Sequence, residues 1–199
     1  MKAAVIAALV GAALLASAYA QAQAQAPTRI RGTISAVSGD VMGVNTTDGK
    51  KVDVQIGDKT NIVFAQPTPI AEIKPGDFLG VTSVKRSDGT LSAYDVRRFP
   101  KPVNPGHRPF DGGDDQTMTN AAVSANVEAA KGRELVLSYE GGSQKVVVAD
   151  TAAITSIVPG QRSQLVPGSY VNLTAAPESD GKLTARSIEV RKDAPKVPR

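Results

Sequence analysis

The stretch TNIVFAQPTPIAEIKPGDFLGVTSVKRSDGTLSAYDVRRF, residues 60–99, aligns without a gap to AAITSIVPGQRSQLVPGSYVNLTAAPESDGKLTARSIEVR, residues 152–191. The offset is a constant 92 residues (168 − 76). The matched positions include residue types that turns require and one aromatic position: Pro75-Gly76 with Pro167-Gly168, Asp88-Gly89 with Asp180-Gly181, and Phe78 with Tyr170. Two copies of one module are the simplest explanation of this alignment.

The first copy reads as five short strands and one short helix. Ile30, Gly32 and Ile34 alternate with polar residues, as a half-buried strand requires. Similar patterns and turn dipeptides predict strands over 29–36, 41–46, 51–56, 77–86 and 91–99. Gly57-Asp58 is expected to bend the chain before a short run over 60–64. Thr68 as N-cap, with proline after it, predicts one or two helical turns through Ile73.

The second copy repeats this order from about Ala122. Val123, Ala125 and Val127 are aligned with Ile30, Gly32 and Ile34 at an offset of 93 (123 − 30). Strands are expected over 135–139, 145–148, 169–176 and 183–191, with the helix position at 160–165.

Three strands, a short helix and a hairpin form the element order of a small OB-like barrel. The sequence therefore predicts an all-β protein with two tandem barrels, each carrying one short helix. The first is expected over residues 27–99 and the second over 122–192. The stretch 100–121, rich in Pro, Gly and Asp, is expected to be a partly ordered linker, and 193–199 a disordered basic tail.

The first 20 residues have the three zones of a secretory signal. Met1-Lys2 precedes the apolar run Ala3 to Ala16, and Ala18 and Ala20 fit the small-residue cleavage rule. The run of about 14 residues is shorter than the roughly 18–20 that cross a bilayer. We therefore expect residues 1–20 to be a signal peptide and the mature chain to be periplasmic or secreted, with no membrane span.

Composition removes several classes of function. The chain has no cysteine and one histidine, and its net charge of +4 is spread along the sequence. Cysteine and serine hydrolases need an imidazole held rigidly beside the nucleophile, and zinc sites need several Cys or His ligands. No Gly-rich phosphate loop opens a helix, and no tryptophan offers a stacking platform for bases. We expect neither an enzyme, nor a cofactor, nor a nucleic-acid partner.

The linker holds the strongest candidates for binding. A solvent-exposed spacer would rarely need His107, Phe110 and Met118, so part of the linker is expected to pack across the two barrels. A ligand in the cleft between the barrels is expected to contact the linker residues His107, Arg108, Phe110 and Asp111. A divalent cation is the alternative, with oxygen and nitrogen ligands from His107, Asp111, Asp114 and Asp115. Solvation of the linker is the favoured explanation of the same acidic residues.

A cationic cluster stands where the first barrel meets the linker. It consists of Arg97, Arg98, Lys101 and Arg108. A solvated, charged strand edge is the favoured explanation, and an anionic polymer or the surface of an envelope protein is the alternative partner for such a cluster.

Four motifs of the first copy form a recurring pattern: Gly32-Thr33-Ile34-Ser35-Ala36-Val37, Thr47-Asp48-Gly49-Lys50, Ile73-Lys74-Pro75-Gly76-Asp77 and Asp88-Gly89-Thr90-Leu91-Ser92-Ala93. This pattern resembles the exported bacterial family called domain of unknown function 5666. The second copy matches loosely. The resemblance implies a periplasmic OB-like module and no known reaction.

These observations together predict an exported, non-enzymatic binding or scaffolding protein built from a duplicated module. A divalent-metal-binding accessory protein that uses the linker is the alternative.

Overall fold

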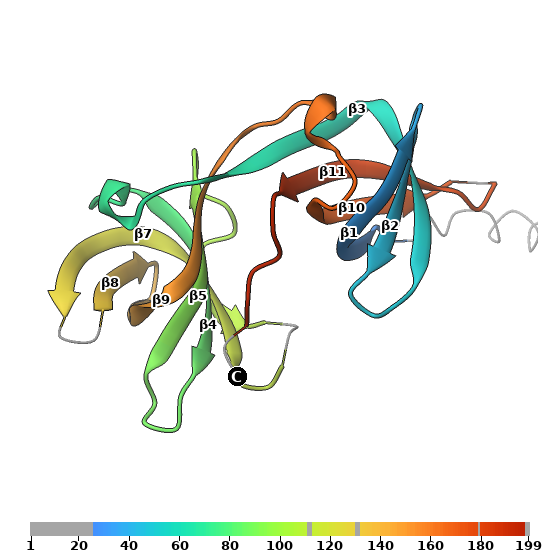
Figure 1. The fold of residues 1–199 in the computed structure, drawn as a ribbon. Helices are drawn as coiled ribbons and strands as arrows, with labels where there is room; N and C mark the ends of the chain where they lie inside the picture. Colours follow the sequence, from blue (N-terminus) through green and yellow to red (C-terminus); the bar gives the residue numbers. More distant parts are fainter. Residues whose placement is uncertain (1–25, 111–112, 130–131, 179, 198–199) are drawn as a thin grey trace, which may run out of the picture.

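The computed structural model describes residues 26–110, 113–129, 132–178 and 180–197, and the predicted signal peptide lies outside them. The structure is nearly all-β, as predicted, and its described residues include two single-turn 3₁₀ helices (Figure 1). The strands are β1 (Thr28–Ser38), β2 (Val41–Thr46), β3 (Lys51–Pro67), β4 (Phe78–Lys85), β5 (Leu91–Phe99), β6 (Gly106–Pro109), β7 (Gln116–Ala129), β8 (Gly132–Tyr139), β9 (Gly142–Pro159), β10 (Tyr170–Pro177) and β11 (Leu183–Arg191).

A closed barrel is formed by β1, β2, β3, β11 and β10, which we call the first ring. β1 pairs with β2 and β10, β2 with β3, β10 with β11, and β11 in parallel with β3, so no edge is left open. Inward side chains from all five strands fill it, including Ile34, Met42, Val54, Leu173 and Ile188.

The pairings of β7, β8, β9, β5 and β4 also close on themselves, and we call this circuit the second ring. It surrounds a separate core that includes Leu79, Val81, Leu135, Leu137 and Val146. The two cores share no residue. β6 adds to the outer side of β7 and stands at one end of the strand order.

The chain exchanges hairpins between the two rings. The β4–β5 hairpin follows the first three strands in sequence, yet it completes the ring of β7, β8 and β9. The β10–β11 hairpin follows β9, yet it completes the ring of β1, β2 and β3. This differs from the expectation that residues 27–99 and 122–192 each close on themselves.

The exchange follows from the length of β3 and β9, which run from one ring to the other (Figure 1). They cross antiparallel over residues 63–67 and 155–159, with Ala65 opposite Ile157 at the centre. These two residues are 92 apart (157 − 65), so the crossing relates the copies by an approximate twofold axis. Thr68 N donates to Ile154 O at 3.0 Å, and Gly160 N donates to Ile62 O at 2.9 Å. The equivalent bonds close the crossing at both ends.

The bend expected at Gly57-Asp58 is present as a bulge within a continuous strand. Four residues of β3, 57–60, stand against the single Arg186 of β11 between two paired stretches. Thr60 Oγ1 holds the bulge by donating to Ala185 O at 2.8 Å. Residues 149–152 of β9 form the equivalent bulge against β5. Because the strand resumes after each bulge, the chain leaves its own ring instead of folding back.

Both helices are shorter than predicted. They span Ile70–Glu72 and Arg162–Gln164, and Pro69, not Thr68, occupies the N-cap of the first without a side-chain cap bond. The turns that follow agree with the alignment. Gly76 and Gly168 have φ of +93° and +91°, a left-handed backbone that only glycine adopts at little cost.

The expected correspondence of β1 with β7 needs correction. Ile34 exchanges backbone hydrogen bonds of 2.9 Å with Gly168 and Ser169, and Val123 does so with Gly76 at 2.9 Å and with Asp77 at 2.8 Å. The offset is therefore 89 (123 − 34), not 93. A shift of four residues keeps every side chain on the same face of a strand, so alternation could not reveal it.

The segment expected to be a linker is partly strand. β6 and the first part of β7 fall within residues 100–121, and β7 pairs with β4 from Gln116 onward. At the other end of the chain, Ala194, Pro195 and Val197 of the expected disordered tail line a cavity beside β11. Among the described residues, neither helix has the length and apolar character needed to cross a bilayer.

The exchange predicts which cysteine pairs will cross-link. Gln55 and Thr184 are neighbours across β3 and β11, whereas a ring closed within one copy would bring Gln55 beside Ser92. In a chain without native cysteine, Gln55→Cys with Thr184→Cys should form an intramolecular disulfide under mild oxidation. Gln55→Cys with Ser92→Cys should stay reduced. Peptide mass mapping of the monomer fraction reports both, and the reverse pattern would contradict hairpin exchange.

Gly32 predicts a stability effect. It lies where β1 passes closely over β2, and a Cβ there would stand 2.2 Å from Asn45 O. Gly32→Ala should lower the free energy of unfolding by about 1–3 kcal/mol, because backbone must move. Gly57→Ala is the matched control, since its Cβ would meet nothing within 4 Å. Urea unfolding compares the two, and equal effects would show that Gly32 is not a close-approach site.

Candidate interbarrel groove

Two adjoining cavities lie between the rings, and together we call them the interbarrel groove. Their volumes are about 310 and 670 Å³. Both are lined by Arg31 of β1, Arg97 of β5, Asn172 of β10 and Phe110 of the linker. The groove therefore takes side chains from the first ring, the second ring and the linker at once.

The structure separates the predicted ligand-binding residues. Arg108 and Phe110 line the larger cavity, and the Phe110 ring lies under the guanidinium of Arg31 with 5.1 Å between its centroid and the Arg31 Cζ. His107 does not line either cavity. Its Nδ1 instead lies 2.9 Å from Thr119 Oγ1, within the β6–β7 pairing. Asp111 lies outside the described residues.

The metal candidates are not assembled in the described part of the chain. There, no group of three or more His, Asp or Glu side chains could hold an ion. Burial lowers the pKa of His107 below its usual value, which favours the neutral imidazole. Asp114 and Asp115 are exposed in the turn before β7, and Asp115 O accepts a hydrogen bond from Lys85 N at 2.8 Å.

The floor of the smaller cavity is a network of four charged side chains, Asp95, Arg97, Glu189 and Arg191. Arg191 Nη1 donates to Asp95 Oδ1 at 2.9 Å, and Arg97 Nη1 donates to Glu189 Oε2 at 3.2 Å. The first pair is almost fully buried, with 6% and 7% of the side chains exposed. Two cations and two anions cancel, so this network adds no net charge to the groove.

Arg97 is held in its charged form by this network. Burial acts to lower its pKa, but the carboxylates of Glu189 and Asp95 raise it above the usual value. Arg97 Nε lies 3.5 Å from Asp95 Oδ2 without hydrogen-bond geometry, so that contact is electrostatic. Because β5 belongs to the second ring and β11 to the first, each of these ion pairs except Arg97–Asp95 ties one ring to the other.

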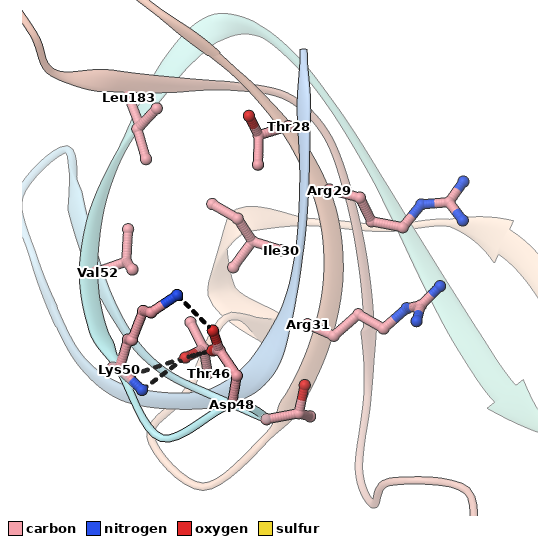
Figure 2. Close-up of a pocket in the computed structure, with 10 residues that line it drawn as sticks. Thr28, Arg29, Ile30, Arg31, Thr46, Asp48, Lys50, Val52 and Leu183 are labelled. Atoms are coloured by element: carbon pink, nitrogen blue, oxygen red, sulfur yellow. Dashed lines mark hydrogen bonds and ion pairs between the residues drawn. The ribbon is translucent and has the colours of Figure 1, made fainter. Parts of the chain in front are cut away.

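The wall of the larger cavity is cationic and has polar amides. Arg29 and Arg31 extend from the same side of β1, away from the barrel interior (Figure 2). Asn172 pairs directly with Arg31 across the β1–β10 ladder. Sequence reasoning missed Arg29, Arg31 and Asn172 as site residues. The available signal was two arginines spaced by two on an outward strand face, but only hairpin exchange brings Asn172 beside them.

The predicted cationic cluster is dispersed. Arg97 belongs to the charged network, and Arg98 donates to Ser156 Oγ at 3.1 Å and to Glu72 O at 3.2 Å. Lys101 lines a different cavity. Arg97 and Arg108 both line the larger cavity with Arg29 and Arg31, but Arg97 is already paired with Glu189. The groove therefore has a cationic wall of different composition from the one expected.

A third cavity of about 310 Å³ opens at the mouth of the first ring (Figure 2). Ile30, Val52 and Leu183 give it an apolar wall. Three polar residues of the β2–β3 turn at its rim bind one another: Lys50 Nζ lies 2.7 Å from Asp48 Oδ2, and Thr46 Oγ1 also bonds Asp48. Lys50 and Thr46 lower the pKa of Asp48 to about 2. These polar groups therefore have hydrogen-bond partners without a ligand.

The charged network predicts a large difference between buried and exposed ion pairs. Arg191→Met leaves Asp95 buried without its nearest cation and should lower the free energy of unfolding by about 3–5 kcal/mol. Lys145→Met is the control, because Lys145 is 67% exposed in its pair with Glu134. That change should cost less than about 1 kcal/mol. Urea unfolding measures both, and equal costs would mean that the network does not stabilise the junction.

Comparison with known proteins gives no relative from which a role could be transferred. No protein-family model matches the chain, and no curated protein matches it. The groove is therefore interpreted from its own residues and contacts.

Proposed function

We propose that this chain is an exported, non-enzymatic binding or scaffolding protein whose ligand occupies the interbarrel groove. The observation that carries the proposal is that both rings and the linker meet at Arg31, Arg97, Phe110 and Asn172. Concave sites of several hundred Å³ at the junction of two substructures are where ligands usually bind. The signal pattern of residues 1–20 supports export to the periplasm or beyond.

A binding role suits the chemistry of the groove better than catalysis. The carboxylates at its floor, Asp95 and Glu189, each bind an arginine, so neither is available as a general base without breaking an ion pair. Tyr94 donates to Gln116 Oε1 at 2.6 Å. The charged side chains at the floor of the groove hold the two rings together and give the groove a fixed shape. A receptor or a scaffold requires such a preformed surface.

The internal symmetry supports duplication of one OB-like unit as the origin of the fold. The crossing of β3 and β9 is centred on positions 92 residues apart, and the turns at Gly76 and Gly168 are equivalent. We infer that the two rings are two OB-like barrels that have exchanged their C-terminal hairpins. The resemblance to the domain of unknown function 5666 agrees with this origin and remains a prediction.

Filling the groove tests the proposed function. Asn172→Trp places a large ring where both cavities meet, whereas Thr28→Trp places the same ring at the mouth of the first ring. The probes are a galacturonate hexamer, maltohexaose and a short oligodeoxythymidylate, titrated by calorimetry. We expect at least one to bind the parent protein and to lose about tenfold or more in affinity in Asn172→Trp, an effect of about 1.4 kcal/mol.

The mouth variant is the control for this test. Thr28→Trp should bind the same probe as tightly as the parent, because Thr28 does not line the groove. Thermal unfolding should confirm that both variants are folded. Binding that survives Asn172→Trp and is lost in Thr28→Trp would move the site to the barrel mouth and contradict the proposal.

A further inference from the structure

We infer that the interbarrel groove takes an extended acidic glycan, with the anionic groups of the glycan on Arg29, Arg31 and Arg108. The inference rests on the proposed function, since it names the class of ligand for the same groove. It is argued from the charge, the spacing and the apolar surface of the larger cavity.

The charge of the larger cavity is one-sided. Four arginines line it, and no acidic residue is among the described residues that do so. The charge of Arg97 is balanced by Glu189 and Asp95. In the described part of the chain, Arg29 and Arg108 form no ion pair, and Arg108 only donates to Asn104 O at 3.2 Å. An anionic ligand would therefore meet a positive wall in which Arg29 and Arg108 are not neutralised by a carboxylate of the described residues.

The type and spacing of the cations favour oxyanions along a chain. All of them are arginines, whose planar forks match carboxylate and sulfate oxygens in pairs. Arg29 and Arg31 are two residues apart on one strand face, so their stems are about 7 Å apart. Together they form a row of cations along β1, which suits a linear ligand better than a compact one.

The rest of the cavity suits sugar rings. Its apolar surface comes from Phe99, Phe110, Val103 and Met118, against which the C–H faces of pyranoses can pack. Asn172 is half-buried beside Arg31 and has both a donor and an acceptor for hydroxyl groups. Nucleic acid is disfavoured, because one face of each phenyl ring already carries an arginine: Arg31 on Phe110 and Arg97 on Phe99.

The experiment titrates the mature chain with four probes: a galacturonate hexamer, a sulfated oligosaccharide, neutral maltohexaose and a short oligodeoxythymidylate. We expect at least one acidic glycan to bind and to weaken as salt is raised, with maltohexaose at least about tenfold weaker. The uronate and sulfate arms distinguish the source of the anionic group. Arg29→Gln and Arg108→Gln should each weaken the acidic glycan about tenfold, because a charge-assisted hydrogen bond is lost.

Arg186→Gln is the matched control. It removes the same charge from an exposed position of β11 that does not line the groove, so it should leave affinity unchanged. Thermal unfolding of every variant separates loss of binding from loss of fold.

Three outcomes would overturn the inference. If the acidic and neutral hexamers bind equally and both are lost in Asn172→Trp, the groove is still a binding site but its preference for acidic glycans is refuted. Oligodeoxythymidylate that binds more tightly than either acidic glycan, with the same dependence on Arg29 and Arg108, would identify a nucleic-acid groove. Absence of binding by both acidic glycans would refute the inference outright.

Discussion

Hydrogen bonding between β3 and β9 at their crossing is the constraint on which the rest of this structure depends. Each strand begins in one ring and ends in the other, and residues 63–67 pair with 155–159 between them. The hairpin that follows each of these strands, β4–β5 after β3 and β10–β11 after β9, therefore lies in the opposite ring. Ten residues, 68–77 and 160–169, connect each long strand to its hairpin, and each connection includes one 3₁₀ turn. Each connection is bonded to the opposite ring, since Gly76 N donates to Val123 O and Gly168 N donates to Ile34 O, both at 2.9 Å.

The groove is a consequence of the same crossing. Because β10 and β11 close the first ring, Asn172 lies beside Arg31, and Glu189 and Arg191 reach the side chains of β5. In a chain with two self-contained barrels, the fold itself would not bring these groups together. The buried ion pairs then fix the junction, since separating the rings would leave charges without partners in a dry environment. The walls of the groove are therefore held in place by the fold itself.

The sequence predicted the local structure better than the connections between distant segments. Turn glycines such as Gly76 and Gly168, and most strands, follow from local patterns. Hairpin exchange does not follow from local patterns, because the alternation of side chains along β11 is the same whether β11 pairs with β3 or with β9. Of the groove residues, Arg108 and Phe110 stood out in a Pro-rich linker. Asn172 carried no signal, since its role depends on a strand more than 140 residues earlier (172 − 31).

A single chain allows an asymmetry that two identical chains could not have. Arg97 and Glu189 are 92 residues apart and occupy equivalent positions, yet they bind each other across the approximate twofold axis at 3.2 Å. In a symmetric dimer this position would meet its own copy, and two identical charges there would repel in a site with little solvent. Within one chain the two positions can carry different residues, so opposite charges can pair. The linker then covers one side of the axis only, with Phe110 under Arg31, so the cationic groove has no equivalent formed by a second linker.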